Sequence, residues 1–227
     1  MSNPSDPLNE KSSSTFLEGF RDPQKVRELA SRIRNELTEP VTFMEVCGTH
    51  TMAVHRFGLR DLIPPDLNLL SGPGCPVCVT PGLFCEKARR LAADPEITIC
   101  TFGDLVRVPG PHGSLDDARA EGANIQIVYS PQQALEIAVS APDRRIVFLG
   151  VGFETTAPLT AAVLQQAKNR RIDNFFVLSG HKVMPPAMKA LVNTEEIRID
   201  GFLCPGHVSV AIGAEPYRFL AEDKGKP

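Results

Sequence analysis

Short apolar segments alternate along the chain with longer segments in which apolar residues recur every three or four positions. The short segments are rich in β-branched residues, which favours strands, and the longer ones are typical of amphipathic helices. Strands are expected at residues 41–47, 67–70, 97–101, 125–129, 146–149, 175–178 and 202–204. Helices are expected at residues 23–37, 81–93, 114–122, 131–139, 155–168, 185–192 and 216–221. This alternation predicts βαβ units and an α/β fold with largely parallel sheets.

The 227 residues are enough for one large or two small domains, each with its own core. The first segment, MSNPSDPLNEKSSST, is polar and rich in Ser and Pro, so we expect a disordered tail over residues 1–20. We expect a first α/β domain at residues 21–123 and a second at residues 124–227.

Charge and hydropathy narrow the class of protein. The net charge is -3, and the 24 basic residues are spread along the chain, so we expect no nucleic-acid partner. No apolar run approaches the roughly 18 residues of a membrane span, and no signal peptide opens the chain, which predicts a soluble, cytoplasmic protein. In that compartment, six cysteines favour metal or redox chemistry over a disulfide framework.

Nearly every expected strand runs into a loop containing Gly, Pro, His or Cys. The loops are CGTHT, SGPGCPVC, TFGD, YSP, GVGFETT, SGHK and CPGH. Ligands of open α/β sheets bind beyond the carboxyl ends of the strands, so these loops predict a site there.

The strongest candidate site combines two cysteine motifs. Cys47 ends the apolar strand VTFMEVC, where a following helix would turn its positive dipole end toward the thiol, and His50 lies three residues later. The loop GPGCPVC presents Cys75 and Cys78, with 24 residues between His50 and Cys75. Three thiols and an imidazole suit zinc or iron, and the close pair also suits dithiol redox chemistry.

The other cysteines fit simpler interpretations. Cys85 falls on a helix and Cys100 inside an apolar strand, so both are expected to be small core residues. For Cys204 the sequence does not decide between a core residue and a functional residue, since it lies close to His207. Cys47 fits a buried core residue equally well when it is considered alone.

The remaining polar loops carry weaker signals. GVGFETT lacks the third glycine of a dinucleotide-binding loop and the Lys of a phosphate-binding loop. Thr155 and Thr156 fit helix caps, and Glu154 fits either a solvated charge or a polar group in a cleft. His181 and Lys182 equally fit exposed residues before a helix that opens with Pro. No Ser-His-Asp arrangement has a recognisable local context.

The motifs EVCGTHT, GPGCPVC, TFGDLVRVPG, GFETT, HKVMPP and PGHVS occur in this order from about residue 20 to the end. Together they resemble the HypD family of NiFe-hydrogenase maturation factors. The resemblance implies two Rossmann-like α/β halves facing a central cleft. It also implies a scaffold that binds iron while the Fe(CN)2CO group is assembled with HypC and HypE, before transfer to the hydrogenase large subunit.

The resemblance also implies roles for the cysteine site. Cys47 would be the principal iron ligand, and His50 a ligand or close neighbour. Cys75 and Cys78 would be redox-active or assist at the same iron. Cyanide and carbon monoxide need an electron-rich iron, and thiolates supply electron density.

Further expectations concern the cleft. The resemblance implies that Glu154, His181 and His207 provide polar contacts there. Family members often carry a second histidine in the first motif, where this chain has Met52. Its role would be absent or would be taken by a soft thioether.

The last expectation concerns length. The family continues beyond this point with a C-terminal region whose cysteines hold a 4Fe-4S cluster, so no such cluster is expected here. No strand candidate follows residues 216–221, and we expect the second half to be an incomplete, truncated sheet. The alternatives to an iron scaffold are a CxxC dithiol oxidoreductase and a structural zinc-binding α/β protein.

Overall fold

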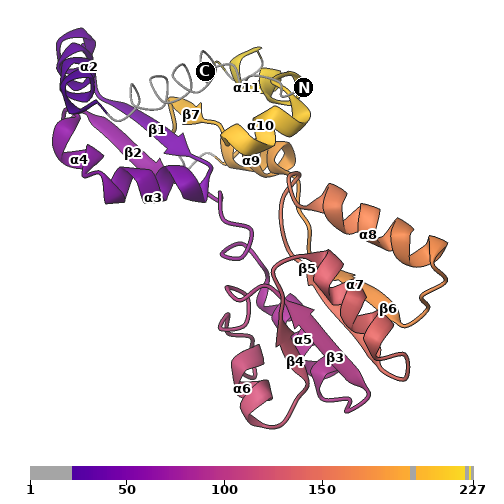
Figure 1. Ribbon diagram of the computed structural model, residues 1–227. Helices are drawn as coiled ribbons and strands as arrows, with labels where there is room; N and C mark the ends of the chain where they lie inside the picture. The colour runs from indigo at the N-terminus through magenta and orange to yellow at the C-terminus, as the bar shows by residue number, and fades with distance from the viewer. Residues whose placement is uncertain (1–21, 195–197, 223–224, 226–227) are drawn as a thin grey trace, which may run out of the picture.

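The structure, a computed structural model, describes residues 22–194, 198–222 and 225. The tail expected at residues 1–20 lies outside this range. Within it, parallel strands form two separate sheets (Figure 1). The strands are β1 (Val41–Glu45), β2 (Leu67–Ser71), β3 (Ile97–Thr101), β4 (Ile125–Ile127), β5 (Arg145–Gly150), β6 (Phe175–Ser179) and β7 (Gly201–Leu203).

Helices lie before, between and after these strands. They are α2 (Pro23–Glu36), α3 (Gly48–Arg56), α4 (Leu59–Leu62), α5 (Gly82–Ala92), α6 (Leu115–Ala120), α7 (Pro131–Ser140), α8 (Ala157–Asn169), α9 (Met184–Val192), α10 (Gly206–Ile212), the 3₁₀ turn η1 (Glu215–Tyr217) and α11 (Arg218–Glu222). The α/β class with parallel sheets is confirmed, and all seven expected strands are present.

The differences from expectation are local. The first strand ends at Glu45 and not at Cys47, because the chain leaves the sheet there and turns into α3. The helix α8 begins at Ala157, two residues later than expected. Two helices were not expected: α4 spans only four residues, and α10 follows Pro205 in the CPGH loop.

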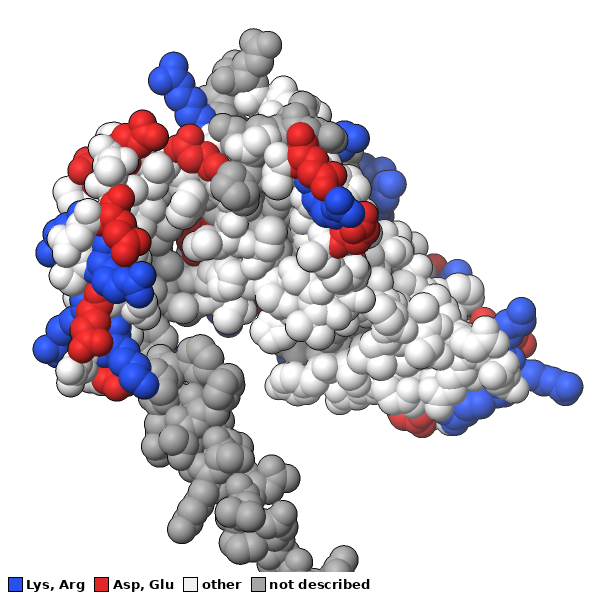
Figure 2. Space-filling model, turned by 90° about the horizontal axis from the view of Figure 1, so that it is seen from above, with Lys and Arg blue, Asp and Glu red and all other residues white. Residues whose placement is uncertain are grey.

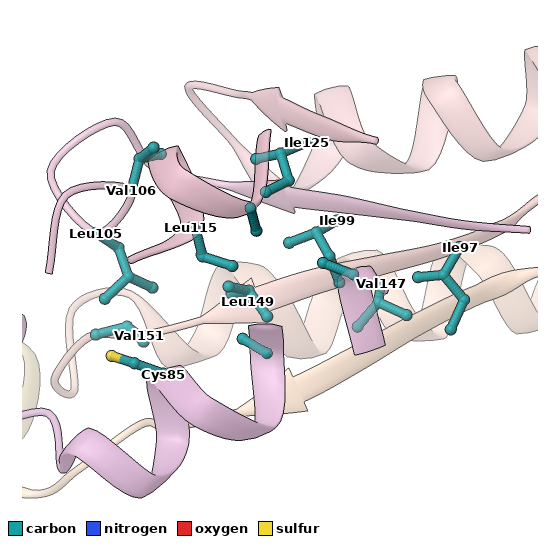
Figure 3. Packing of buried hydrophobic residues seen from close by; sticks show 13 residues of the cluster. Cys85, Ile97, Ile99, Leu105, Val106, Leu115, Ile125, Val147, Leu149 and Val151 are labelled. Carbon is teal, nitrogen blue, oxygen red and sulfur yellow. The ribbon is translucent and has the colours of Figure 1, made fainter. Parts of the chain in front are cut away.

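The four-stranded sheet has the order β4-β3-β5-β6, and its central strands β3 and β5 are buried on both faces. Alternate residues of β3 and β5 point to opposite sides, as strand geometry requires. Ile97, Ile99, Val147 and Leu149 pack on one side with α5 and α6 (Figure 3). Phe148 packs on the other side with α7 and α8. Two burying faces explain why these strands read as uninterrupted apolar runs.

Two cysteines belong to this region as expected. Cys85 is 4% exposed and Cys100 is fully buried. Figure 3 shows Cys85 among the aliphatic side chains of the same core. Burial raises the pKa of the Cys100 thiol to about 12. Both therefore behave as small core residues.

The three-stranded sheet has the order β2-β1-β7. Its core lies on one face, where Met44 and Val46 pack against Met184 of α9 and Val208 of α10. Phe202 of β7 is opposite Met44 in the register and joins this cluster.

The sheets do not follow the division into residues 21–123 and 124–227. Strands β3 and β4 lie on opposite sides of that boundary yet pair with each other, and β3 also pairs with β5. Strand β7 pairs with β1, from the opposite end of the chain. Along the sequence, the segment that forms the four-stranded sheet therefore lies between β2 and β7 of the three-stranded sheet. The extents of separately folding domains stay a prediction.

The molecular surface mixes charges of both signs. On the face shown in Figure 2, Lys and Arg lie interspersed with Asp and Glu toward the margins, around a broad area without charged side chains. Within the part of the chain that the structure describes, no helix has the length and apolar character needed to cross a membrane.

Candidate functional site

Cys47 lies at the start of helix α3, directly beyond the carboxyl end of β1. Its backbone is extended, with φ -150° and ψ 122°, and its carbonyl oxygen accepts the N–H groups of His50 at 2.9 Å and Thr51 at 3.2 Å. The Cys47 side chain caps no N–H group of the helix. The thiol is therefore left available for other partners.

The second cysteine loop lies directly against the first. The N–H of Gly48 donates to the carbonyl oxygen of Gly74 at 3.2 Å. A Cβ atom added at Gly74 would come within 2.5 Å of the Cα of Cys47 and closer still to its nitrogen. Only glycine fits here, because the neighbouring atoms belong to the backbone and cannot rotate away. The two loops are thus held together by their main chains.

Cys75 and Cys78 form a close pair of free thiols. The two sulfur atoms lie 2.6 Å apart, and the N–H of Cys78 donates to the sulfur of Cys75 at 3.2 Å. The hydrogen bond to Cys75, followed by burial, raises the pKa of Cys78. The Cys78 thiol therefore keeps its proton to a higher pH than an ordinary cysteine does.

A pocket of about 650 Å³ joins the two cysteine loops to residues from farther along the chain. Cys47, Cys75 and Met52 line one part of it, and His207 lines another. Thr155, from the loop after β5, also contributes. Met52 is 66% exposed, so its thioether lies at the surface of this pocket.

Glu154 and His181 line a different pocket, of about 550 Å³, together with Lys182. One carboxylate oxygen of Glu154 accepts the N–H of Met184 at 2.6 Å, which ties the loop after β5 to the start of α9. The hydroxyl of Ser179 lies 3.2 Å from Nδ1 of His181. Burial lowers the pKa of His181, which favours its neutral form. The expected cleft residues are thus divided between two pockets, with His207 on the cysteine side.

His50 does not line the pocket that contains Cys47. Its Nδ1 atom is buried and has no hydrogen-bond partner among the described residues. Across the described ranges, no group of three or more His, Cys, Asp and Glu side chains is arranged to hold a metal ion. The four residues Cys47, His50, Cys75 and Cys78 therefore do not form a closed tetrahedral zinc site in this conformation.

Two further residues of the same region carried no expected role. Glu45, at the end of β1, is 1% exposed, and its Oε1 atom accepts the hydroxyl of Ser71 at 2.7 Å. The signal was available in the sequence, because a glutamate within the apolar run VTFMEVC must be buried with a partner.

Cys204 lies at the edge of the core that carries the cysteine loops. It is half-buried and packs against the cluster of Met44 and Val46. Burial raises the pKa of its thiol. This environment favours a structural role for Cys204.

The fold and the site together define an α/β protein with a cysteine centre at the carboxyl ends of parallel strands. Residues 24–227 match the family model described as "HypD: Hydrogenase formation hypA family". The chain belongs to the HypD family, as the sequence motifs predicted.

Curated relatives agree with this assignment. Over 219 residues the chain is 45% identical to the hydrogenase maturation factor HypD of Escherichia coli (strain K12), covering 93% of this chain and 59% of the relative. It is 46% identical to the HypD of Rhodobacter capsulatus, covering 93% of this chain and 58% of the relative. The chain therefore spans 58–59% of the length of these two relatives.

Proposed function

We propose that this chain acts in NiFe-hydrogenase maturation, as a scaffold that holds an iron atom at Cys47 while its cyanide and carbon monoxide ligands are attached. The observation that carries the proposal is the backbone contact between Gly48 and Gly74, which holds Cys47 and Cys75 in one pocket. The names of the relatives, which are hydrogenase maturation factors, support the process.

Iron is the cargo of this site and not a resident cofactor. Two cyanides and one carbon monoxide would occupy three positions of the finished group, so the protein has to supply only a few ligands. An open site with Cys47 as the anchor fits that need better than a closed four-residue cage. The thiolate contributes electron density to the iron, which favours binding of both kinds of diatomic ligand. His50 is the proposed ligand or close neighbour.

The pair of Cys75 and Cys78 is proposed as the redox or auxiliary part of the site. Closing the pair to a disulfide would release two electrons and two protons, and reduction would restore both thiols. The 2.6 Å separation of the sulfur atoms supports such cycling next to Cys47.

The proposed partners follow from the same process. A small HypC-like chaperone would share the iron, a HypE-like protein would supply the cyanide, and the precursor of the hydrogenase large subunit would receive the product. We propose a cytoplasmic location for these steps. His207 lies in the cysteine pocket, whereas Glu154 and His181 are proposed as polar contacts in the neighbouring one.

Infrared spectroscopy tests the proposal. The chain would be produced together with its HypC-like and HypE-like partners, and we expect cyanide and carbon monoxide stretching bands in the purified complex. Cys47→Ala should abolish the bands, whereas Cys85→Ala, in the core of the other sheet, should keep them. Absence of bands from the unmodified complex, or their persistence in Cys47→Ala, would contradict the scaffold function.

A dithiol oxidoreductase is the second candidate, and the close Cys75–Cys78 pair is the observation that favours it. A thiol titration across a series of redox buffers measures whether the pair cycles. A pair that stays reduced or oxidised throughout would eliminate this function, while leaving the iron anchor at Cys47 intact.

A further inference from the structure

The pocket that contains Cys47 has an apolar floor. Its most deeply buried lining residues include Val46, Phe153, Met184 and Val208, and none of these four is more than 6% exposed. They come from the end of β1, the loop after β5 and the starts of α9 and α10. Among the described residues that line the pocket, no polar side chain is buried to this degree. The side chains of the floor therefore offer a ligand no hydrogen bond.

The rim of the same pocket is polar. Thr49, Thr155 and His207 line it, and all three are exposed. A threonine hydroxyl and an imidazole N–H can each donate a hydrogen bond to a ligand. Thr155 and His207 belong to the loop after β5 and to α10, so they lie outside the two cysteine loops. The rim thus brings hydrogen-bond donors from other parts of the fold to the cysteine site.

Cys47 lies at the border between the floor and the rim. Its side chain is half-buried, and it follows the fully buried Val46 and precedes the exposed Thr49 by two positions. The pocket of about 650 Å³ has far more room than one iron atom with three diatomic ligands needs. Ligands of an iron atom bound at Cys47 can therefore point toward both environments.

Cyanide and carbon monoxide make opposite demands on their surroundings. An iron-bound cyanide carries negative charge, and its nitrogen is a strong hydrogen-bond acceptor. Burying such an acceptor without a donor is costly. The oxygen of an iron-bound carbon monoxide is a weak acceptor, so it loses little in an apolar environment. The rim therefore suits cyanide, and the floor suits carbon monoxide.

We propose that the rim of the pocket is the subsite for the two cyanides and that the floor is the subsite for carbon monoxide. Thr155 and His207 are the specificity-determining residues, because each donates a hydrogen bond to a cyanide nitrogen. The reverse arrangement would bury a charged acceptor on the floor without a partner. The pocket thereby decides which side of the iron each kind of ligand occupies. This inference rests on the proposed function, since it needs iron at Cys47.

Infrared spectroscopy of the complex with the HypC-like and HypE-like partners tests the rim. Thr155→Val removes a hydroxyl with little change of shape, and His207→Phe removes the ring N–H. Each should move a cyanide band to lower wavenumber, because a hydrogen bond at the nitrogen stiffens the C–N bond. The carbon monoxide band should move less. Thr155→Ser and His207→Gln keep a donor and should leave the bands near their original positions, as should Thr194→Val, outside the pocket.

The floor is tested by a variant of its own. Val208→Thr keeps the shape of the side chain and adds a hydroxyl that can donate to carbon monoxide. Such a hydrogen bond draws electron density from the iron into the ligand and weakens its C–O bond. The carbon monoxide band should therefore move to lower wavenumber, whereas the cyanide bands should move less.

The outcomes separate this inference from the proposed function. Cyanide bands that stay in place in both Thr155→Val and His207→Phe would overturn the subsites and leave the scaffold function intact. A larger shift of the cyanide bands than of the carbon monoxide band in Val208→Thr would overturn them too. Absence of bands from the unmodified complex would contradict the scaffold function, and the subsites with it. Loss of all bands in folded Thr155→Val, with bands in Thr155→Ser, would support contact of the hydroxyl with the iron group.

Discussion

The two sheets differ in how they are assembled. The four-stranded sheet comes from one continuous segment, β3 to β6, and packs apolar side chains on both faces. The three-stranded sheet combines β1 and β2 with β7, which lies more than a hundred residues later in the chain. All three proposed thiols follow strands of this second sheet. The proposed cysteine site therefore lies on the sheet whose strands come from distant parts of the sequence.

The two regions are held together by different kinds of contact. The four-stranded sheet holds its shape through side-chain packing, whereas the cysteine loops hold theirs through main-chain contacts at Gly48 and Gly74. The loop after β5 links the two regions, because Glu154 accepts the N–H of Met184. Substitutions in the packed core, at the close main-chain contact of Gly74 and in the loops near Glu154 should therefore change the free energy of unfolding by different amounts.

The largest expected effect comes from the four-stranded sheet. Phe148 is fully buried and meets Phe102 edge to face, with ring centroids 5.5 Å apart. Phe148→Ala should lower the free energy of unfolding by about 3–5 kcal/mol, because it removes packing and leaves a cavity. Phe202→Ala, on the short strand β7, should cost less, about 2 kcal/mol, since Phe202 is 9% exposed. Urea denaturation measures the free energy of unfolding of both variants. Equal losses of stability would contradict the predicted difference between the two sheets.

A substitution at the close main-chain contact of Gly74 should lower the free energy of unfolding by a somewhat smaller amount. Gly74→Ala should cost about 2–3 kcal/mol, because its methyl group would collide with the main chain of Cys47. Gly48→Ala is the matched control: its Cβ would lie 3.8 Å from the Gly74 oxygen, and alanine favours the helix that begins there. Thermal unfolding and the alkylation rate of Cys47 report the change. Similar behaviour of the two variants would argue against the main-chain contact.

The smallest expected effect concerns His181, in the loop between β6 and α9. Burial lowers its pKa below the ordinary 6.5. Between these two pKa values the unfolded chain binds a proton that the folded protein does not, so the free energy of unfolding falls as pH decreases through 6.5. His181→Asn should flatten this dependence between pH 8 and 5. Unfolding at pH 8, where the ring is neutral in both states, serves as the reference, and an unchanged slope would contradict the prediction.

The positions of the strands could be predicted because each is a short apolar run ended by a loop. The sheet that each strand joins could not, since β3 and β7 have the same pattern as strands of either sheet. Pairing of β7 with β1 depends on contacts such as Phe202 with Met44, which no local pattern encodes.

The candidate site was predictable to a similar degree. Cys47 and Cys75 share a pocket because both follow neighbouring parallel strands, as the rule for strand ends predicted. The separation of His207 from Glu154 and His181 depends on which side of the loop after β5 each faces. The burial of Glu45 could have been expected from its place in the apolar run VTFMEVC, whereas its contact with Ser71 depends on the pairing of β1 with β2.

The late position of β7 also sets an order of events on the ribosome. The segment from β3 to β6 is complete once about residue 179 has emerged, and it can close its core while the chain is still growing. The earlier strand β1 must wait for residues 201–203 before its second edge is paired, so the sheet that carries the cysteine loops is completed after the four-stranded sheet. A nascent chain would therefore keep its thiols in an unfinished setting until β7 has emerged.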